Sequence, residues 1–129
     1  VGPLTLAFKR SEGESEGSFS LFESIEPAGA RVHLHRHAAF QETFIVLEGH
    51  FDFEVAGDRQ SLGPGETLVI PRGAAHGFMC TSPEAGRLLT ISTPARVFEA
   101  FVADISAANL GGSAAEVAAV FARHGVELL

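Results

Sequence analysis

Residues 29–49 have the sequence GARVHLHRHAAFQETFIVLEG, and this stretch decides the expected fold. In the segment from Arg31 to His37, three histidines, namely His33, His35 and His37, alternate with Val32, Leu34 and Arg36. This two-residue alternation predicts a β-strand with the histidines on one face. Thr43 to Leu47 is a continuous apolar run that predicts a second strand. Glu48 and Gly49 are expected to end that strand in a tight turn, in which Gly49 supplies a positive φ.

Outward from this stretch, short strands alternate with turns along most of the chain. The predicted strands are Leu4 to Phe8, Ser18 to Glu26, His50 to Ala56, Thr67 to Ile70, His76 to Cys80 and Arg87 to Thr93. Arg10 to Gly17 is expected to be a loop. About eight short strands with turns every eight to twelve residues predict an all-β sandwich or barrel. No long helical pattern separates the strands, which argues against a parallel sheet of alternating strands and helices.

After Thr93 the periodicity becomes helical. Apolar residues recur at steps of three and four and predict an amphipathic helix, namely Val97, Phe98, Phe101, Val102 and Ile105. Asn109 to Gly112 is expected to be a loop, and a capping box of Ser113 and Glu116 predicts a second helix from Ala114 to Arg123. We therefore expect a single domain over residues 1–129, with a barrel from about 4 to 93 and a helical pair from about 94 to 125 on its outside.

Composition and charge exclude several classes of function. The 129 residues carry nine basic and sixteen acidic side chains, a formal net charge of −7, which argues against nucleic acid or an anionic membrane as partner. No apolar run approaches the roughly 20 residues of a membrane helix, and no export signal is expected. A single cysteine indicates a reducing, cytoplasmic location. The absence of tyrosine excludes any mechanism that needs a tyrosine base.

Four residues can converge on one cation: His35, His37, Glu42 and His76. Residues two apart on a strand leave the same face with Cα atoms about 6.6 Å apart, so two imidazoles can reach one ion at about 2.0–2.1 Å. Glu42 begins the next strand and can reach the same ion if that strand pairs antiparallel with the histidine strand. His76 follows a Pro-x-Gly turn and can supply a fourth ligand. A single histidine or a His-x-His pair is weak evidence alone, because most histidines lie at the surface or are satisfied in the core.

The spacing of these residues resembles both motifs of the cupin superfamily. Gly29, five residues, His35-x-His37, four residues, Glu42, six residues and Gly49 look like the first motif. Gly65, five residues, Pro71-x-Gly73, two residues and His76 look like the second motif. The flanking strands extend the similarity to about Thr93, and the helical pair is similar to an appendage of small quercetin-dioxygenase-like cupins. One departure is Cys80, which stands where the family often has asparagine and is expected to be buried and inert.

The resemblance implies a double-stranded β-helix, or jelly-roll barrel, that binds a divalent transition metal. Fe(II), Mn(II), Ni(II) and Zn(II) all suit imidazole and carboxylate ligands. A metal-dependent dioxygenase acting on a small organic substrate is the leading hypothesis, with Glu42 as a catalytic base that also binds the metal. A non-catalytic binding or sensor module and a metal-dependent isomerase stay open as alternatives, so whether the protein is an enzyme is undecided. Cupins often dimerise through N-terminal strands or sheet faces, and we expect a homodimer.

Aromatic side chains are expected to surround the ion with an apolar wall. The candidates for a substrate pocket are Phe40, Phe44, Phe53 and Phe78, although most such residues would serve equally well as ordinary barrel core. His33 shares the parity of the predicted ligands, so it lines the same cavity or replaces His35 if the register slips. Arg72 and His50 are placed in turns near a barrel end, where each would orient an anionic substrate or be solvated.

Overall fold

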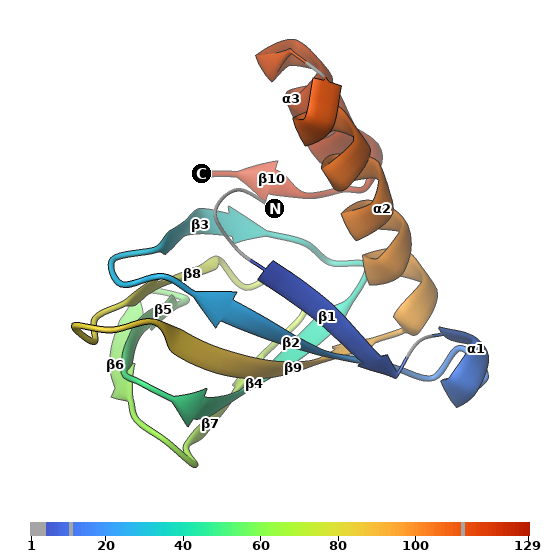
Figure 1. The fold of residues 1–129 in the computed structure, drawn as a ribbon. Helices are drawn as coiled ribbons and strands as arrows, with labels where there is room; N and C mark the ends of the chain where they lie inside the picture. Colours follow the sequence, from blue (N-terminus) through green and yellow to red (C-terminus); the bar gives the residue numbers. More distant parts are fainter. Residues whose placement is uncertain (1–4, 11, 112) are drawn as a thin grey trace.

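Two antiparallel sheets of five strands each face one another, and two helices stand at one end (Figure 1). The computed structural model describes residues 5–10, 12–111 and 113–129. The first sheet has the order β1-β2-β9-β4-β7, with β1 Thr5–Arg10, β2 Ser20–Glu26, β9 Gly86–Thr93, β4 Gln41–Glu48 and β7 Thr67–Ile70. The second has the order β10-β3-β8-β5-β6, with β10 Glu127–Leu128, β3 Arg31–Arg36, β8 His76–Cys80, β5 Phe51–Val55 and β6 Asp58–Leu62. The predicted all-β jelly roll is confirmed.

The histidine strand and the strand that follows it lie in different sheets, so the antiparallel pairing considered as a route for Glu42 to reach the ion does not occur. β3 pairs with β8 and β10, whereas β4 pairs with β7 and β9. The connection between them crosses from one sheet to the other instead of forming a hairpin. Residues on β3 and β4 therefore approach each other across the interior of the barrel, where side chains rather than backbones meet.

Other differences concern short elements. The segment predicted as a loop contains the helix α1 (Glu12–Ser15), and β6 and β10 were not predicted. β10 lies beside β3 and places Leu128 opposite His35, a pairing between the last residues and the middle of the chain that no local pattern signals. Leu4, which was included in the first predicted strand, lies outside the described residues.

A β-bulge interrupts β3 just before the histidines. Its pairing with β8 runs regularly through Val32 opposite Phe78 and then shifts, so that His35 lies opposite His76. The strict alternation predicted for this strand is therefore wrong between Val32 and His35. The extra residue changes which side of the strand the odd-numbered and even-numbered side chains occupy. Gly77 in β8 accommodates the irregularity, since a Cβ there would lie 2.6 Å from the carbonyl oxygen of Val32.

The C-terminal helices cover the open end of the barrel. The helix α3 (Ala114–Arg123) has its predicted bounds, and the Ser113 hydroxyl accepts from the Glu116 backbone N–H. The helix α2 (Ala95–Gly111) extends through most of the loop predicted from Asn109, and Gly112 lies outside the described residues. A purely external position for the pair is wrong, because Phe98 on α2 stacks on Phe22 of β2 with ring centroids 4.7 Å apart.

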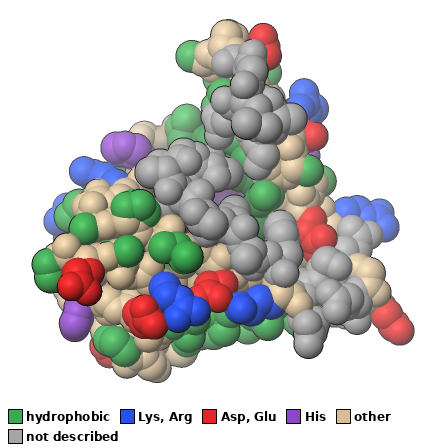
Figure 2. All heavy atoms as spheres, in the orientation of Figure 1, with side chains coloured by type: hydrophobic (Ala, Val, Ile, Leu, Met, Phe, Trp, Pro, Cys, Tyr) green, Lys and Arg blue, Asp and Glu red, His purple; other side chains and the backbone are tan. Residues whose placement is uncertain are grey.

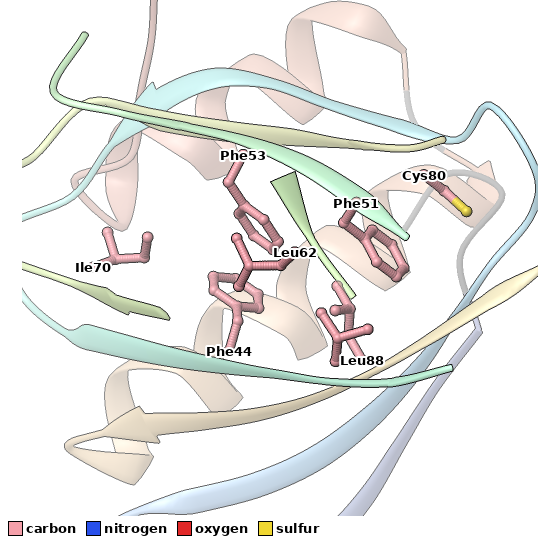
Figure 3. Packing of buried hydrophobic residues seen from close by; sticks show 8 residues of the cluster. Phe44, Phe51, Phe53, Leu62, Ile70, Cys80 and Leu88 are labelled. Carbon is pink, nitrogen blue, oxygen red and sulfur yellow. The ribbon is translucent and has the colours of Figure 1, made fainter. Parts of the chain in front are cut away.

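The main core lies between the two sheets, away from the helices. Its buried residues come from both sheets, as Figure 3 shows: Phe44, Val46, Phe51, Phe53, Leu62, Ile70, Cys80 and Leu88. Gly49 has the predicted positive φ, 83°, and a Cβ there would lie 2.7 Å from the Ser82 hydroxyl; Gly65 also has a positive φ, 85°. None of the helices in the described part of the chain has the length and hydropathy needed to span a bilayer.

Replacing Phe53 tests whether it belongs to this core. Its side chain is 2% exposed and packs within the cluster. We expect Phe53→Ala to lower the free energy of unfolding by about 3–5 kcal/mol, because the cavity adds to the lost transfer energy. Arg59→Ala is the control, since that side chain is 85% exposed on the neighbouring strand β6, and it should change the value by less than about 1 kcal/mol. Urea denaturation measures both, and equal effects would contradict the assignment.

Candidate metal centre

Three histidines and one carboxylate meet inside the barrel. His35 lies near the end of β3, His37 directly follows that strand, and His76 begins β8 opposite His35. Glu42 extends from β4 in the other sheet. One ligand atom from each of these four residues lies within 4.8 Å of the others. His37, Glu42 and His76 are buried and His35 is half-buried, so the cluster is shielded but reachable from one side.

The distances within the cluster suit one small cation. Glu42 Oε2 lies 3.3 Å from His37 Nε2 and 3.2 Å from His76 Nε2. Ligand bonds of about 2.1 Å place neighbouring ligand atoms about 3.0–3.4 Å apart in octahedral or tetrahedral geometry. The rings of His35 and His76 have centroids 4.2 Å apart, which brings the third imidazole to the same centre.

Backbone carbonyls fix which nitrogen of each imidazole faces the cluster. Nδ1 of His35, His37 and His76 lies 2.9, 3.1 and 2.9 Å from the carbonyl oxygens of His33, Phe40 and Ala74, respectively. A carbonyl oxygen can only accept a hydrogen bond, so each Nδ1 carries the hydrogen. Each neutral ring therefore has its lone pair on Nε2, where it can bind a metal ion.

The protein alone leaves this centre electrostatically incomplete. Two Nε2 lone pairs face the same carboxylate oxygen of Glu42, which is a repulsive arrangement unless a proton or a cation lies between them. His37 Nε2 is buried and has no hydrogen-bond partner among the described residues, although Glu42 lies near it. A divalent cation satisfies all of these groups, so the donor set fits a metal ion.

The protonation states also favour metal binding. Burial lowers the pKa of His35 to about 4, and the neighbouring His76 contributes to the decrease. Burial acts to raise the pKa of Glu42, but the contacts with His37 and His76 outweigh it and lower that pKa to about 2. At neutral pH the carboxylate is therefore ionised and His35 is neutral, which are the forms that bind metals.

A cavity of about 330 Å³ opens beside the four residues. Phe40, Phe44, Phe78 and His33 line it, whereas Phe53 does not and lies in the core. His33 is exposed and is not one of the four clustered residues. The helices also contribute walls, which no sequence pattern indicated, through Phe98, Phe101, Val102 and Phe121.

The remaining polar candidates lie outside the cavity. Arg72 donates from its guanidinium to the backbone carbonyls of Ala38, Ala39 and Thr93, so it ties together the segments around the centre. His50 is exposed and does not line the cavity. Cys80 is 1% exposed within the main core, also away from the cavity.

Two further residues of the site were missed from sequence. Gly77 permits the bulge that brings His35 opposite His76, and a glycine within a predicted strand is a recognised sign of such a bulge. Glu26 is 1% exposed and lines the cavity, although it ends a predicted strand beside Pro27, where a charged residue is normally solvated.

Comparisons with known proteins agree with this architecture. The family model for the cupin domain matches residues 21–92, more than half of the chain. The chain is 31% identical over 72 residues to quercetin 2,3-dioxygenase of Bacillus subtilis, a match that covers 56% of this chain and 21% of that protein. The chain spans half or less of the length of the curated relatives it matches.

Solved structures show the same fold. The cupin domain of Schizosaccharomyces pombe Cnp3 aligns with a TM-score of 0.65 and 21% identity, covering 78% of this chain and 71% of that one. The polyketide cyclase RemF of Streptomyces resistomycificus aligns with a TM-score of 0.62 and 26% identity, covering 70% of this chain and 65% of that one.

Metal analysis of purified variants tests the centre. We expect about one divalent ion per chain in the wild type and a large loss in His37→Ala and His76→Ala, because each removes one of four donors. His33→Ala is the matched control on the same strand and should retain the metal, since His33 is not one of the four clustered residues and the substitution keeps the backbone carbonyl that accepts from His35 Nδ1. Undiminished metal in His37→Ala and His76→Ala would contradict the proposed ligand set.

Proposed function

The chain belongs to the cupin domain family, and on this premise we propose that it binds one divalent transition-metal ion through His35, His37, Glu42 and His76. The convergence of three Nε2 atoms and one carboxylate oxygen within 4.8 Å is the observation that carries the proposal. Imidazole and carboxylate ligands suit Fe(II), Mn(II), Ni(II) and Zn(II).

We propose further that the site acts on a small, largely apolar organic substrate as a metal-dependent dioxygenase. A bound ion with four protein ligands leaves room for a chelating substrate and, if it is redox-active, supplies chemistry with dioxygen. The match to a quercetin dioxygenase and the aromatic cavity wall both support this direction.

The residues of the chain have distinct tasks in this proposal. Glu42, the carboxylate of the cluster, accepts the proton that an acidic substrate hydroxyl releases on binding. The carbonyls of His33, Phe40 and Ala74 hold the three imidazoles in one tautomer, so the donor atoms stay oriented without a substrate. Phe44 and Phe78 exclude water from the volume beside the centre.

Oxygen uptake tests the enzymatic part of the proposal. Protein loaded in turn with Fe(II), Mn(II), Ni(II) or Zn(II) is mixed with phenolic, thiol or dicarbonyl compounds in an oxygen electrode. We expect substrate-dependent uptake with at least one redox-active ion and a loss of at least about 100-fold in Glu42→Gln. Ligand binding without uptake for every ion would identify a non-catalytic binding module instead, and isomerised product without uptake would identify a metal-dependent isomerase.

We also propose that the chain forms a homodimer through the outer face of the first sheet. Ile25 and Val69 are 44% and 51% exposed on this face, and β1 is an edge strand. Lys9 and Arg87 form ion pairs with Glu23, and acidic and basic side chains alternate beside hydrophobic ones on the face in Figure 2. Exposed apolar and charged groups together favour a specific contact.

Light scattering after size exclusion tests the dimer. We expect twice the mass of the chain for the wild type and a shift toward the monomer in the double variant Ile25→Arg/Val69→Arg, because two buried cations would be unpaired. Met79→Arg is the control, since Met79 is 38% exposed on the other sheet. A wild-type monomer at high concentration would refute the proposal.

A further inference from the structure

Glu26 is a buried carboxyl group that the metal centre does not use. Its side chain is 1% exposed and lines the same cavity as the three histidines. Oε1 accepts a hydrogen bond of 2.8 Å from the Ser24 hydroxyl, whereas Oε2 has no hydrogen-bond partner among the described residues. An unsatisfied, buried carboxyl oxygen in a cavity with several aromatic walls therefore needs an explanation.

The strand register places Glu26 far from the metal centre. The two carboxyl groups can be placed along β9, which pairs with both β2 and β4. Ser24, to which the Glu26 carboxyl group is hydrogen-bonded, lies opposite Leu88 of β9. Glu42 lies opposite Ser92, four residues further along the same strand. Four residues of an antiparallel strand span about 14 Å. The cavity thus has two polar ends. A ligand of two linked aromatic rings spans this separation once a metal–oxygen bond of about 2 Å at one end and a hydrogen bond of about 2.8 Å at the other are included.

The wall between the two ends is mainly apolar. Phe22, Phe44 and Phe78 line it, together with Thr90, whose hydroxyl is buried and also lacks a partner in the described part of the chain. The phenylalanine rings of this wall can contact a flat ligand along its length. The Thr90 hydroxyl can form one hydrogen bond with the ligand between the two polar ends. The cavity volume of about 330 Å³ lies in the range of small-molecule sites.

Glu26 costs stability where it lies. Burying a carboxyl group with one oxygen unsatisfied is unfavourable, and an apolar side chain of similar size is often neutral or stabilising in such a place. Burial also raises the pKa of Glu26, which the hydrogen bond from Ser24 partly opposes. A group that weakens the fold and faces an open cavity is typical of a binding site.

We propose that the cavity takes an elongated, two-ended ligand: a chelating oxygen head at the histidine cluster, a flat aromatic body, and a hydroxyl group at the far end that hydrogen-bonds to Glu26. The assignment of the head to the cluster rests on the proposed metal site, whereas the assignment of the far hydroxyl to Glu26 does not. Glu26 is then a specificity residue, because a ligand without that hydroxyl leaves the carboxyl oxygen unpaired.

A pair of matched compounds tests this inference. We use 3,4-dihydroxybiphenyl and 3,4,4′-trihydroxybiphenyl, which differ only in the hydroxyl at the far end, and measure their Kd by calorimetry with zinc-loaded protein. We expect the trihydroxy compound to bind about tenfold more tightly to the wild type. Glu26→Leu should abolish this preference, and Glu26→Gln should retain part of it because an amide still donates and accepts.

Controls separate this inference from the metal proposal and from a structural role. Glu84→Leu removes an exposed carboxylate from the loop after β8 and should leave the preference unchanged. The same titrations on chelator-treated protein test the Glu26 end without metal, so failure to load zinc contradicts the metal proposal but not this one. Thermal unfolding of Glu26→Leu should show an equal or higher Tm.

Three outcomes would overturn the inference. The first is equal binding of the two compounds by the wild type. The second is a preference that survives in Glu26→Leu. The third is a lower Tm of Glu26→Leu together with equal losses for both compounds, which would assign Glu26 to the fold instead of the ligand.

Discussion

The tethering of three imidazoles to backbone carbonyls is the constraint on which the site depends. Each carbonyl accepts the Nδ1 hydrogen, so each Nε2 is left to face the cluster, and those of His37 and His76 lie against the same carboxylate oxygen of Glu42. The protein groups alone repel one another there, and burial prevents water from screening them. The barrel therefore maintains an arrangement that is favourable only with a proton or a cation between these groups, and it does so with backbone groups whose positions are fixed by the sheets.

Two details of strand pairing make this arrangement possible. The bulge in β3 reverses the parity of the strand, so that His35 rather than Leu34 lies opposite His76, and Gly77 provides the space for it. The crossing of the chain from β3 to β4 then places Glu42 in the opposite sheet, facing the histidines. A hairpin between these two strands would have put Glu42 beside the histidines instead of across from them.

The aromatic residues form two groups, one that fills the core between the sheets and one that borders the cavity. Phe51 and Phe53 fill the space between the sheets and hold the barrel closed, away from the helices. Phe22, Phe40 and Phe98 form a second cluster where α2 meets the barrel, and this cluster borders the cavity. The same residue type thus stabilises one end and leaves the other open, because the helices cover that end without filling it.

Alternation and turn residues predicted an all-β sandwich or barrel, and the spacing of His35, His37, Glu42 and His76 predicted that they converge. The resemblance to both cupin motifs narrowed the fold to a jelly roll. The sequence also located α3 by its cap. The choice of neighbouring strands came from the three-dimensional fold alone. With it came the position of Glu42 opposite the histidines, the place of Phe53 in the core, the helical wall of the cavity and the burial of Glu26. The physical reason is that local pattern records which side of a strand is apolar, whereas burial and pairing depend on segments distant in the chain.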